Sequence, residues 1–393
     1  MPSKMNAVRV SRALIFALGA SLASAAEPAL RVPPFKVTEI VVESAVRDGR
    51  VRYPAFPALL PLEDGRVLLT YKDGHGHTHD PGAEVNTLEV DLSRGTSREG
   101  VRFTPPEPLL FQCAEPVRFA DGRVALFFDT QFIGPEPRHY RAPMRWTTSA
   151  DNGRTFAAPA VFPVVDGTGY GYPQEGLTIG GTTYLMVMSF GYLAGGHWSM
   201  DILRTEDSGA TWSRVRDLAQ ELNVPGFNEG AMLPHGDGFL IASRSYDGIA
   251  RLHEVDASFR LRRQVNLTDE SPWINGYIGR PRWLRHGENI YLLGRNWTQP
   301  APAPVRRSGD NPLGFPPAQQ LCLFRIDPGT LRPVTGWILD NAENAPVTDG
   351  YYAVAATSGA AADEKLHLFT YKALGGGPPS LIRLEFRWSD FVE

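Results

Sequence analysis

The segment PVRFADGRVALFFD, residues 116–129, holds two apolar runs separated by an Asp-Gly pair. Asp-Gly between alternating apolar runs is a strong short-range signal for a β-hairpin. A Gly-bearing turn between two such runs occurs six times along the chain. The other five instances are LLPLEDGRVLLTY (59–71), GLTIGGTTYLMVM (176–188), AMLPHGDGFLIAS (231–243), PRWLRHGENIYLLG (281–294) and AATSGAAADEKLHLFTY (355–371). Intervals of roughly 50 to 75 residues leave space for about four short strands in each unit.

Six such units predict the all-β fold class, as a six-bladed β-propeller of four-stranded antiparallel blades. Radial repetition leaves only short, protected strand edges, which favours this arrangement. A β-sandwich or a series of separate β domains is the alternative, but no Pro/Gly/Ser-rich linker divides the chain. We therefore expect residues 27–393 to form a single propeller domain.

Residues 1–26 differ in composition from the remainder. Lys4, Arg9 and Arg12 precede an apolar run that ends in small residues, which is the pattern of a secretory signal peptide. The run of about 14 apolar residues is shorter than the roughly 20 needed to span a bilayer. We therefore expect a secreted or periplasmic protein, monomeric, with no membrane span in its mature chain.

Charge and cysteine content narrow the classes of partner. Loss of Lys4, Arg9 and Arg12 with the leader would change the formal net charge from −4 to −7. An acidic chain without a basic patch is a poor nucleic-acid binder, so we expect no nucleic-acid partner. Cys113 and Cys322 are the only cysteines. Export permits a disulfide between them, but two isolated cysteines leave the pairing open.

Two short segments share a turn pattern: SADNGRTF (149–156) and TEDSGATW (205–212). Asp and Ser/Thr side chains in such a turn bond backbone amides, and Gly takes a conformation that other residues resist. We therefore interpret Asp151 and Asp207 as structural. The pattern resembles the Asp box, or BNR repeat, of the sialidase superfamily, and NEGAML (228–233) with the strands after it resembles the sialidase segment that carries a catalytic Glu.

The resemblance implies three catalytic residues. Glu229 corresponds to the Glu that takes the proton of the nucleophilic Tyr, and Tyr351 to that nucleophile, with Tyr352 as its near alternative. Asp80 corresponds to the general acid. A neutral Tyr suits a substrate whose own carboxylate would repel a carboxylate nucleophile, and sialidases are an exception to the two-carboxylate rule.

The resemblance also implies arginines that bind the substrate carboxylate through paired, charge-assisted hydrogen bonds. Arg251, or as a second choice Arg244, corresponds to the second of three arginines, and Arg280 corresponds to the third. Where sialidases begin their first blade with Arg-Ile-Pro, this chain has Ala-Phe-Pro at 55–57. The first arginine is missing at that spacing, and Arg52 fits only with a shifted register.

The segment GHGHTHD, residues 74–80, is a second departure from the resemblance. His75, His77 and His79 alternate, so an extended strand would place them on one face. Such imidazoles suit acid–base chemistry near neutrality, a metal ion, or simply a polar rim. Some sialidase-related propellers act on uronate-containing polysaccharide through His and Tyr, and Tyr140 is a candidate partner here. We expect no metal and no cofactor.

The leading interpretation is a glycoside hydrolase that resembles an exo-sialidase and acts on a terminal acidic sugar of a glycan. The alternatives are a lyase or other glycosidase that uses His75 or His77, and a non-catalytic carbohydrate-binding propeller. Glu115 and Glu175 begin two inner strands and are further candidates for substrate contact, or for a pair of carboxylates in a retaining glycosidase. Four tryptophans (Trp146, Trp212, Trp273 and Trp297) are expected mostly between blades.

Overall fold

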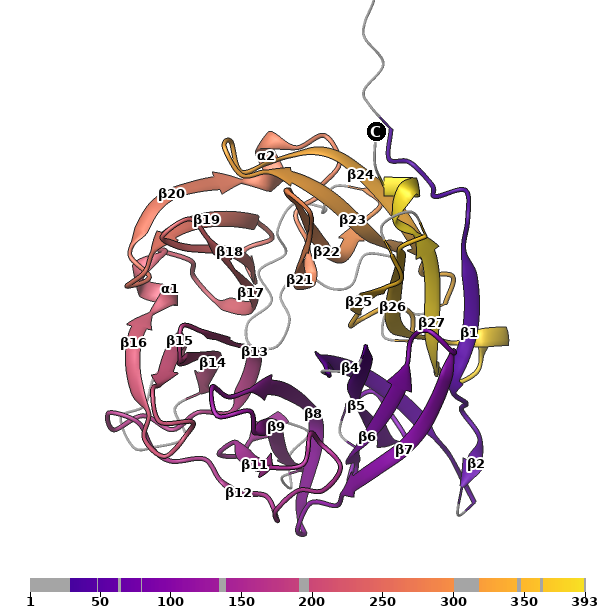
Figure 1. The fold of residues 1–393 in the computed structure, drawn as a ribbon, viewed down its shortest axis with the longest axis vertical. Helices are drawn as coiled ribbons and strands as arrows, with labels where there is room; N and C mark the ends of the chain where they lie inside the picture. The colour runs from indigo at the N-terminus through magenta and orange to yellow at the C-terminus, as the bar shows by residue number, and fades with distance from the viewer. Residues whose placement is uncertain are drawn as a thin grey trace, which may run out of the picture.

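The computed structural model describes residues 29–391, apart from residues 48, 63–64, 79, 134–138, 191–197, 300–317, 345–347 and 361–362. Across this part of the chain, six antiparallel sheets are arranged as blades around a central axis, which confirms the predicted six-bladed β-propeller (Figure 1). The expected leader, residues 1–26, lies outside the described residues.

The first three blades follow one another in chain order. Blade 1 consists of β4 (Tyr53–Pro61), β5 (Arg66–Gly74), β6 (Glu84–Asp91) and β7 (Thr96–Phe103). Blade 2 consists of β8 (Leu109–Arg118), β9 (Val124–Ile133), β11 (Arg145–Ser149) and β12 (Ala160–Val161), and the short strand β10 (His139–Arg141) pairs with the end of β9. Blade 3 consists of β13 (Tyr172–Ile179), β14 (Thr182–Phe190), β15 (Trp198–Thr205) and β16 (Ser213–Asp217).

The remaining blades complete the ring. Blade 4 consists of β17 (Phe227–His235), β18 (Gly238–Ser245), β19 (Ala250–Asp256) and β20 (Leu261–Asn266). Blade 5 consists of β21 (Gly279–His286), β22 (Asn289–Trp297), β23 (Gln319–Asp327) and β24 (Arg332–Asn341). Blade 6 combines β25 (Val354–Ser358), β26 (Lys365–Lys372) and β27 (Ser380–Arg387) with β1 (Val37–Val42).

The sixth blade therefore contains strands from both ends of the described chain. Strand β1, drawn in indigo, pairs antiparallel with β27, drawn in yellow, from Val37 opposite Glu385 to Val42 opposite Leu381 (Figure 1). A small hairpin of β2 (Val46–Arg47) and β3 (Arg50–Val51) leads from β1 into blade 1. This pairing closes the ring.

Each of the six predicted hairpins forms the first and second strands of a blade, so the repeat read from the sequence is confirmed. In the hairpin quoted first, the Gly122 backbone has a φ of 87°. This left-handed conformation strains residues that carry a Cβ, which explains the Gly in the turn.

The two Asp-centred turns are built in the same way. Asp151 accepts hydrogen bonds from the N–H (2.8 Å) and hydroxyl (2.6 Å) of Thr155, and Asp207 accepts the equivalent bonds from Thr211 (2.9 and 2.6 Å). Both turns follow the third strand of a blade, β11 and β15. A Cβ added at Gly153 would lie 2.9 Å from Leu68 of blade 1, so this turn rests directly on the preceding blade.

Blades pack against one another through large side chains. Between blades 2 and 3, Trp146 stacks on Phe127 at a ring distance of 5.9 Å, and Trp212 meets the same ring edge-on. Trp297 of blade 5 is buried and stacks on Tyr277 at 5.1 Å. Trp273 packs, partly buried, against the core cluster that joins blades 4 and 5.

Helical segments in the described part are short and connect strands. They are α1 (Leu218–Glu221), α2 (Leu267–Glu270) and the 3-10 turns η1 (Leu374–Gly376) and η2 (Trp388–Phe391). The Asp217 side chain caps α1 by accepting from the Gln220 N–H, and Asn266 caps α2 in the same way through Thr268. Among the described residues, every helix is too short to cross a bilayer.

Candidate functional site

The first strands of blades 1 to 5 each contain a β-bulge near their beginning, and this end of the propeller is here called the bulged end. A bulge inserts one residue and re-aims the side chains around it. The bulge segments include Phe56, Gln112, Gln174, Asn228 and Arg280. Phe56 and Arg280 have φ values of 53° and 43°, so the backbone at these two positions is strained.

Glu229 follows the bulge of β17 and is buried. Its Oε2 accepts a hydrogen bond of 2.8 Å from the backbone N–H of Arg280. The same oxygen lies 3.7 Å from Nη1 of Arg244, the residue opposite Glu229 on β18. Arg244 Nη1 also donates to the Asn228 side-chain oxygen. The Glu229 carboxylate is thus in contact with a side chain of its own blade and with the backbone of blade 5.

Tyr351 lies in the segment before β25 and is half-buried. The Arg295 guanidinium lies over its ring, 3.8 Å from the centroid. Burial raises the pKa of Tyr351 well above its usual value, and Glu229 raises it further, while Arg295 and Arg244 act in the opposite direction. Tyr351 is therefore a neutral phenol at physiological pH, within electrostatic reach of one carboxylate and two guanidinium groups.

Tyr277 links the two arginines. Its ring lies 4.8 Å from the Arg244 guanidinium, and its hydroxyl accepts a hydrogen bond from Arg295 Nη2. Together, Glu229, Arg244, Tyr277, Arg295 and Tyr351 form a group that we call the axial cluster. It contains two guanidinium groups and one carboxylate, so it suits a negatively charged ligand.

Arg280 is engaged elsewhere through its side chain. Its Nη2 lies 3.2 Å from Glu115 Oε2 and donates to the Gln174 carbonyl oxygen at 2.9 Å, and its Nη1 donates to the Gln174 side chain. The guanidinium also lies between the rings of Tyr172 and Tyr352, at 5.4 and 4.7 Å. The Arg280 side chain is buried, and its partners are protein groups.

Arg282 joins the same buried network. Its Nη2 lies 2.7 Å from Glu115 Oε2, and its Nη1 lies 3.7 Å from Glu175 Oε1. Glu175 also accepts a 2.6 Å hydrogen bond from the Met232 N–H. Burial raises the pKa of Glu175 to about 7, although the Arg282 charge opposes the shift. Glu115 and Glu175 therefore serve as partners of two arginines in the described structure.

Asp80 organises the loop after β5. Its Oδ2 accepts hydrogen bonds from the backbone N–H groups of His75 (2.7 Å) and Gly76 (3.0 Å). The Lys72 ammonium lies 3.0 Å from the same oxygen and donates to the carbonyl oxygens of Gly76 (2.7 Å) and His77 (3.1 Å). A Cβ at Gly74 would overlap Oδ2, so Gly at this position makes the arrangement possible.

This loop places His77 beside the axial cluster. The His77 ring lies 5.0 Å from the Tyr351 ring and 5.0 Å from Phe56. The Gln112 side chain holds the loop by donating to the His77 carbonyl oxygen at 2.7 Å. His75 is exposed, and its Nδ1 lies 2.9 Å from the carbonyl oxygen of Val51.

Arg251 lies on β19, the third strand of its blade, and pairs with Asp247 at 2.5 Å. Of the two residues considered for the second arginine, Arg244 is the one beside Glu229. In the first blade Ala55 is fully buried, and Arg52 forms a two-point pair with Asp73 at 3.0 and 2.7 Å.

Several sequence expectations fall on other parts of the chain. His79 lies outside the described residues, as does the side chain of Tyr140. Within the described part, no three His, Cys, Asp or Glu side chains gather as metal ligands would. Cys113 and Cys322 are both free thiols and buried.

Two members of the axial cluster, Tyr277 and Arg295, were not anticipated from the sequence. Arg295 lies on the second strand of the predicted blade-5 hairpin, in a polar interruption (GRN, 294–296) of an otherwise apolar run. Arg244 occupies the corresponding strand of blade 4. The sequence feature that could have identified Arg295 is therefore a charged residue late in the second strand of a predicted hairpin.

Comparisons with known proteins find the same fold in solved structures of low sequence identity. No family model matches the sequence, and no curated protein matches it either. A Dyadobacter fermentans protein of unknown function aligns with 89% of this chain and 99% of its own, at 14% identity and a TM-score of 0.59. The NanB sialidase of Streptococcus pneumoniae aligns with 89% of this chain and 70% of its own, at 11% identity and a TM-score of 0.57.

An α-L-arabinofuranosidase from Fusarium graminearum is similar to the same extent. It aligns with 90% of this chain and 98% of its own, at 15% identity and a TM-score of 0.56. Identities at this level establish the fold alone. The chain has the six-bladed, sialidase-like β-propeller fold that these glycoside hydrolases share.

Proposed function

We propose that the protein is a glycoside hydrolase that removes a terminal acidic sugar from a glycan at the axial cluster. The observation that supports this most is the gathering of Tyr351, Glu229, Arg244 and Arg295, which come from blades 4 and 5 and the segment before β25. Structural likeness to sialidases and to an arabinofuranosidase adds support for a sugar substrate.

In this proposal Tyr351 is the nucleophile. A neutral phenol approaches an anomeric carbon that carries a carboxylate without the repulsion that Asp or Glu would meet. Its raised pKa means that it needs a base as it attacks, and Glu229 is the carboxylate that interacts with it. The bond from the Arg280 N–H holds Glu229 in place.

Arg244 and Arg295 are proposed to bind the substrate carboxylate. Both are buried beside Tyr351. The axial cluster thus contains two positive charges and only one carboxylate, that of Glu229. Arg280 and Arg251, which the sialidase resemblance implied for this role, are already bound to Glu115 and Asp247. We therefore assign Arg280 to positioning Glu229.

The proton for the leaving group is proposed to come from His77. Three donors converge on one Asp80 oxygen, so this carboxylate is already engaged in holding the loop. His77 lies beside Tyr351, and an imidazole titrates near neutrality. Asp80 then acts by shaping the loop that carries His77.

The same pair of rings supports a second candidate function. A His and a Tyr 5.0 Å apart at an arginine-rich site also suit a lyase acting on uronate-containing polysaccharide. One of the pair would remove the proton next to the uronate carboxylate, and the other would donate a proton to the glycosidic oxygen as its C–O bond breaks. A carbon–carbon double bond would remain in the product. Ultraviolet absorbance of that double bond distinguishes a lyase from a hydrolase.

Release of methylumbelliferone from its sialoside tests the proposal. We expect Glu229→Gln to lower kcat by about 10²–10⁴, the usual contribution of a general base. Tyr351→Phe should lower it at least as much, and Tyr352→Phe, which alters the adjacent stacked ring, is the matched control. Activity unchanged in Tyr351→Phe would refute the mechanism. Glycan binding without any product would favour a non-catalytic propeller.

A further inference from the structure

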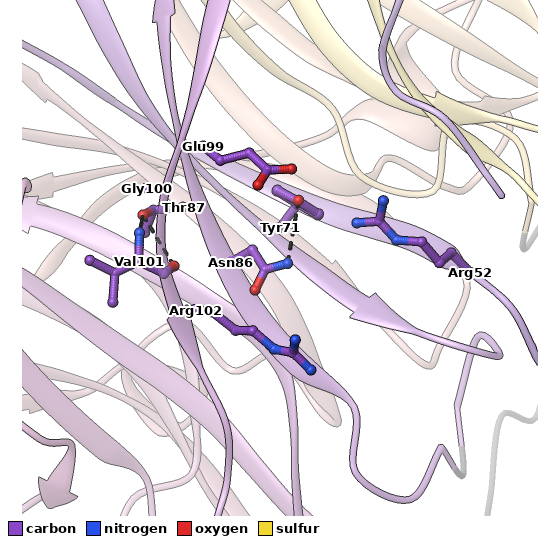
Figure 2. Close-up of a pocket in the computed structure, with 8 residues that line it drawn as sticks. All are labelled: Arg52, Tyr71, Asn86, Thr87, Glu99, Gly100, Val101 and Arg102. Carbon is purple, nitrogen blue, oxygen red and sulfur yellow. Dashed lines mark hydrogen bonds between the residues drawn. The ribbon is translucent and has the colours of Figure 1, made fainter. Parts of the chain in front are cut away.

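A polar cavity of about 250 Å³ lies within blade 1, and none of its lining residues belongs to the axial cluster (Figure 2). Side chains from β5, β6 and β7 line it, and Arg52 reaches it from the residue before β4. It is somewhat smaller than the roughly 300–1,000 Å³ of sites for drug-sized ligands. The space suits one small ring.

The cavity exists because β7 is bulged. Gly100 and Val101 of β7 stand opposite the single residue Thr87 of β6. The Thr87 hydroxyl accepts a 2.7 Å hydrogen bond from the Val101 N–H, as Figure 2 shows. A Cβ at Gly100 would overlap this hydroxyl, so the bulge requires Gly there. Bulges near sheet edges commonly re-aim side chains at functional positions.

Donors and acceptors alternate around the cavity. Tyr71, Asn86 and Arg102 are cross-strand neighbours on β5, β6 and β7, and line one side. Asn86 Nδ2 donates to Asp73 at 3.0 Å, while Asn86 Oδ1 is buried and has no hydrogen-bond partner in the structure. This oxygen has almost no accessible surface, so it belongs to the wall of the cavity. Glu99, which is exposed, is the acceptor that a ligand can reach.

The charges of the lining are largely balanced within the protein. Arg52 is paired with Asp73 at 2.7 Å, and Arg102 with Glu84. A strongly anionic ligand would have to compete with these carboxylates. A polyhydroxyl ring does not, because each hydroxyl both donates and accepts. We propose that this cavity binds a neutral sugar unit.

The cavity and the axial cluster share the bulged end. Arg52 lines the cavity, and the next residue, Tyr53, contacts the His77 ring at 6.3 Å. His77 in turn contacts Tyr351. This extension rests on the proposed function. A glycan whose acidic end lies at the axial cluster would then place a neutral sugar in the cavity. The substrate would then be an oligosaccharide.

Saturation-transfer NMR with methyl β-galactoside, methyl α-glucoside and N-acetylglucosamine tests binding without turnover. At least one of these sugars should bind, and Arg102→Met or Glu99→Gln should weaken its binding by about tenfold, as expected for loss of one charged hydrogen bond. Both side chains are substantially exposed, so these variants should fold. Glu288→Gln, an exposed carboxylate in the β21–β22 hairpin, is the matched control and should leave binding unchanged.

The proposal is overturned if none of the three sugars binds, or if binding persists in both Arg102→Met and Glu99→Gln. It is equally overturned if Tyr351→Phe alone abolishes binding, because the sugar would then lie at the axial cluster. Sugar binding with no hydrolysis of any sialoside would leave this site standing while the proposed function fails. If hydrolysis occurs, Arg102→Met should lower kcat/KM for sialyllactose and leave that for methylumbelliferyl sialoside unchanged.

Discussion

Replacing Lys72 by Met is expected to destabilise the protein and to displace the loop that carries His77. Met keeps most of the buried volume of the Lys side chain but removes its ammonium, which is fully buried and donates to two carbonyl oxygens beside Asp80. Removing one partner of a buried ion pair typically costs about 3–5 kcal/mol. Two backbone N–H groups still reach Asp80, so we expect the lower end, about 3 kcal/mol.

Urea unfolding followed by tryptophan fluorescence measures this free energy, and the double variant Lys72→Met/Asp80→Asn isolates the pair. Because the double variant has neither the ammonium nor the carboxylate, no buried charge is left unpaired. It should therefore be more stable than the sum of the two single effects predicts, by about 1–3 kcal/mol. A cost below about 1 kcal/mol for Lys72→Met would refute the reasoning, since ordinary substitutions reach that value. Additive single effects would also refute it.

Three further predictions concern titration and thiol chemistry. The pKa of Asp207 is lowered to about 2 by its bonds to Thr211. The stability that this carboxylate contributes should therefore be lost as pH falls from about 4 toward 2. In acid unfolding, Asp207→Asn should lose less stability over this interval than the unaltered protein does. The pKa of Glu175 is raised by burial to about 7 from 4.5, so the stability of the protein should fall as pH rises through that interval. Glu175→Gln should flatten this dependence of stability on pH, measured by thermal unfolding. A steeper profile in either variant would contradict these assignments. Cys113 and Cys322 should resist iodoacetamide in the native protein and react after unfolding, because burial raises the pKa of both thiols; native labelling detected by mass spectrometry would disprove this.

The architecture was predictable because its signal is local. Every hairpin combines a turn and two strands within about 15 residues, and turn chemistry of this kind is readable from sequence. The resemblance to sialidases also identified Glu229 and Tyr351, which the structure places within electrostatic reach of each other. Their catalytic roles remain predictions.

The positions of the arginines around Glu229 were harder to predict from the sequence. Arg244 lies near the end of the second strand of its blade, and Arg251 lies on the third, farther from the first strand that carries Glu229. Choosing the candidate on the strand next to that of Glu229 would have favoured Arg244 over Arg251. The pairing of Arg280 with Glu115 joins residues 165 positions apart across the propeller, and no local pattern predicts such a contact.

The bulges are the other feature that sequence periodicity does not reveal. One inserted residue shifts the alternation of a strand by one position, so a period-of-two reading fails there. Gln174 and Asn228 each precede a predicted Glu, yet both contribute hydrogen bonds at the bulged end. The hairpins were therefore predicted correctly, while the bulges at the strand starts, and the side-chain directions that they set, were not part of the prediction.

Closure of the ring by β1 and β27 has a consequence for how the chain is made. A ribosome produces β1 long before β27, so the β1 edge has no native partner until the strands of the other five blades have been made. Its sequence, VTEIVV, is apolar with a single charge, and an unpaired edge of this kind invites aggregation. That charge, Glu39, forms an ion pair with Arg383 on β27 only after closure. Chains truncated before β27 should therefore aggregate rather than accumulate as five-bladed folds.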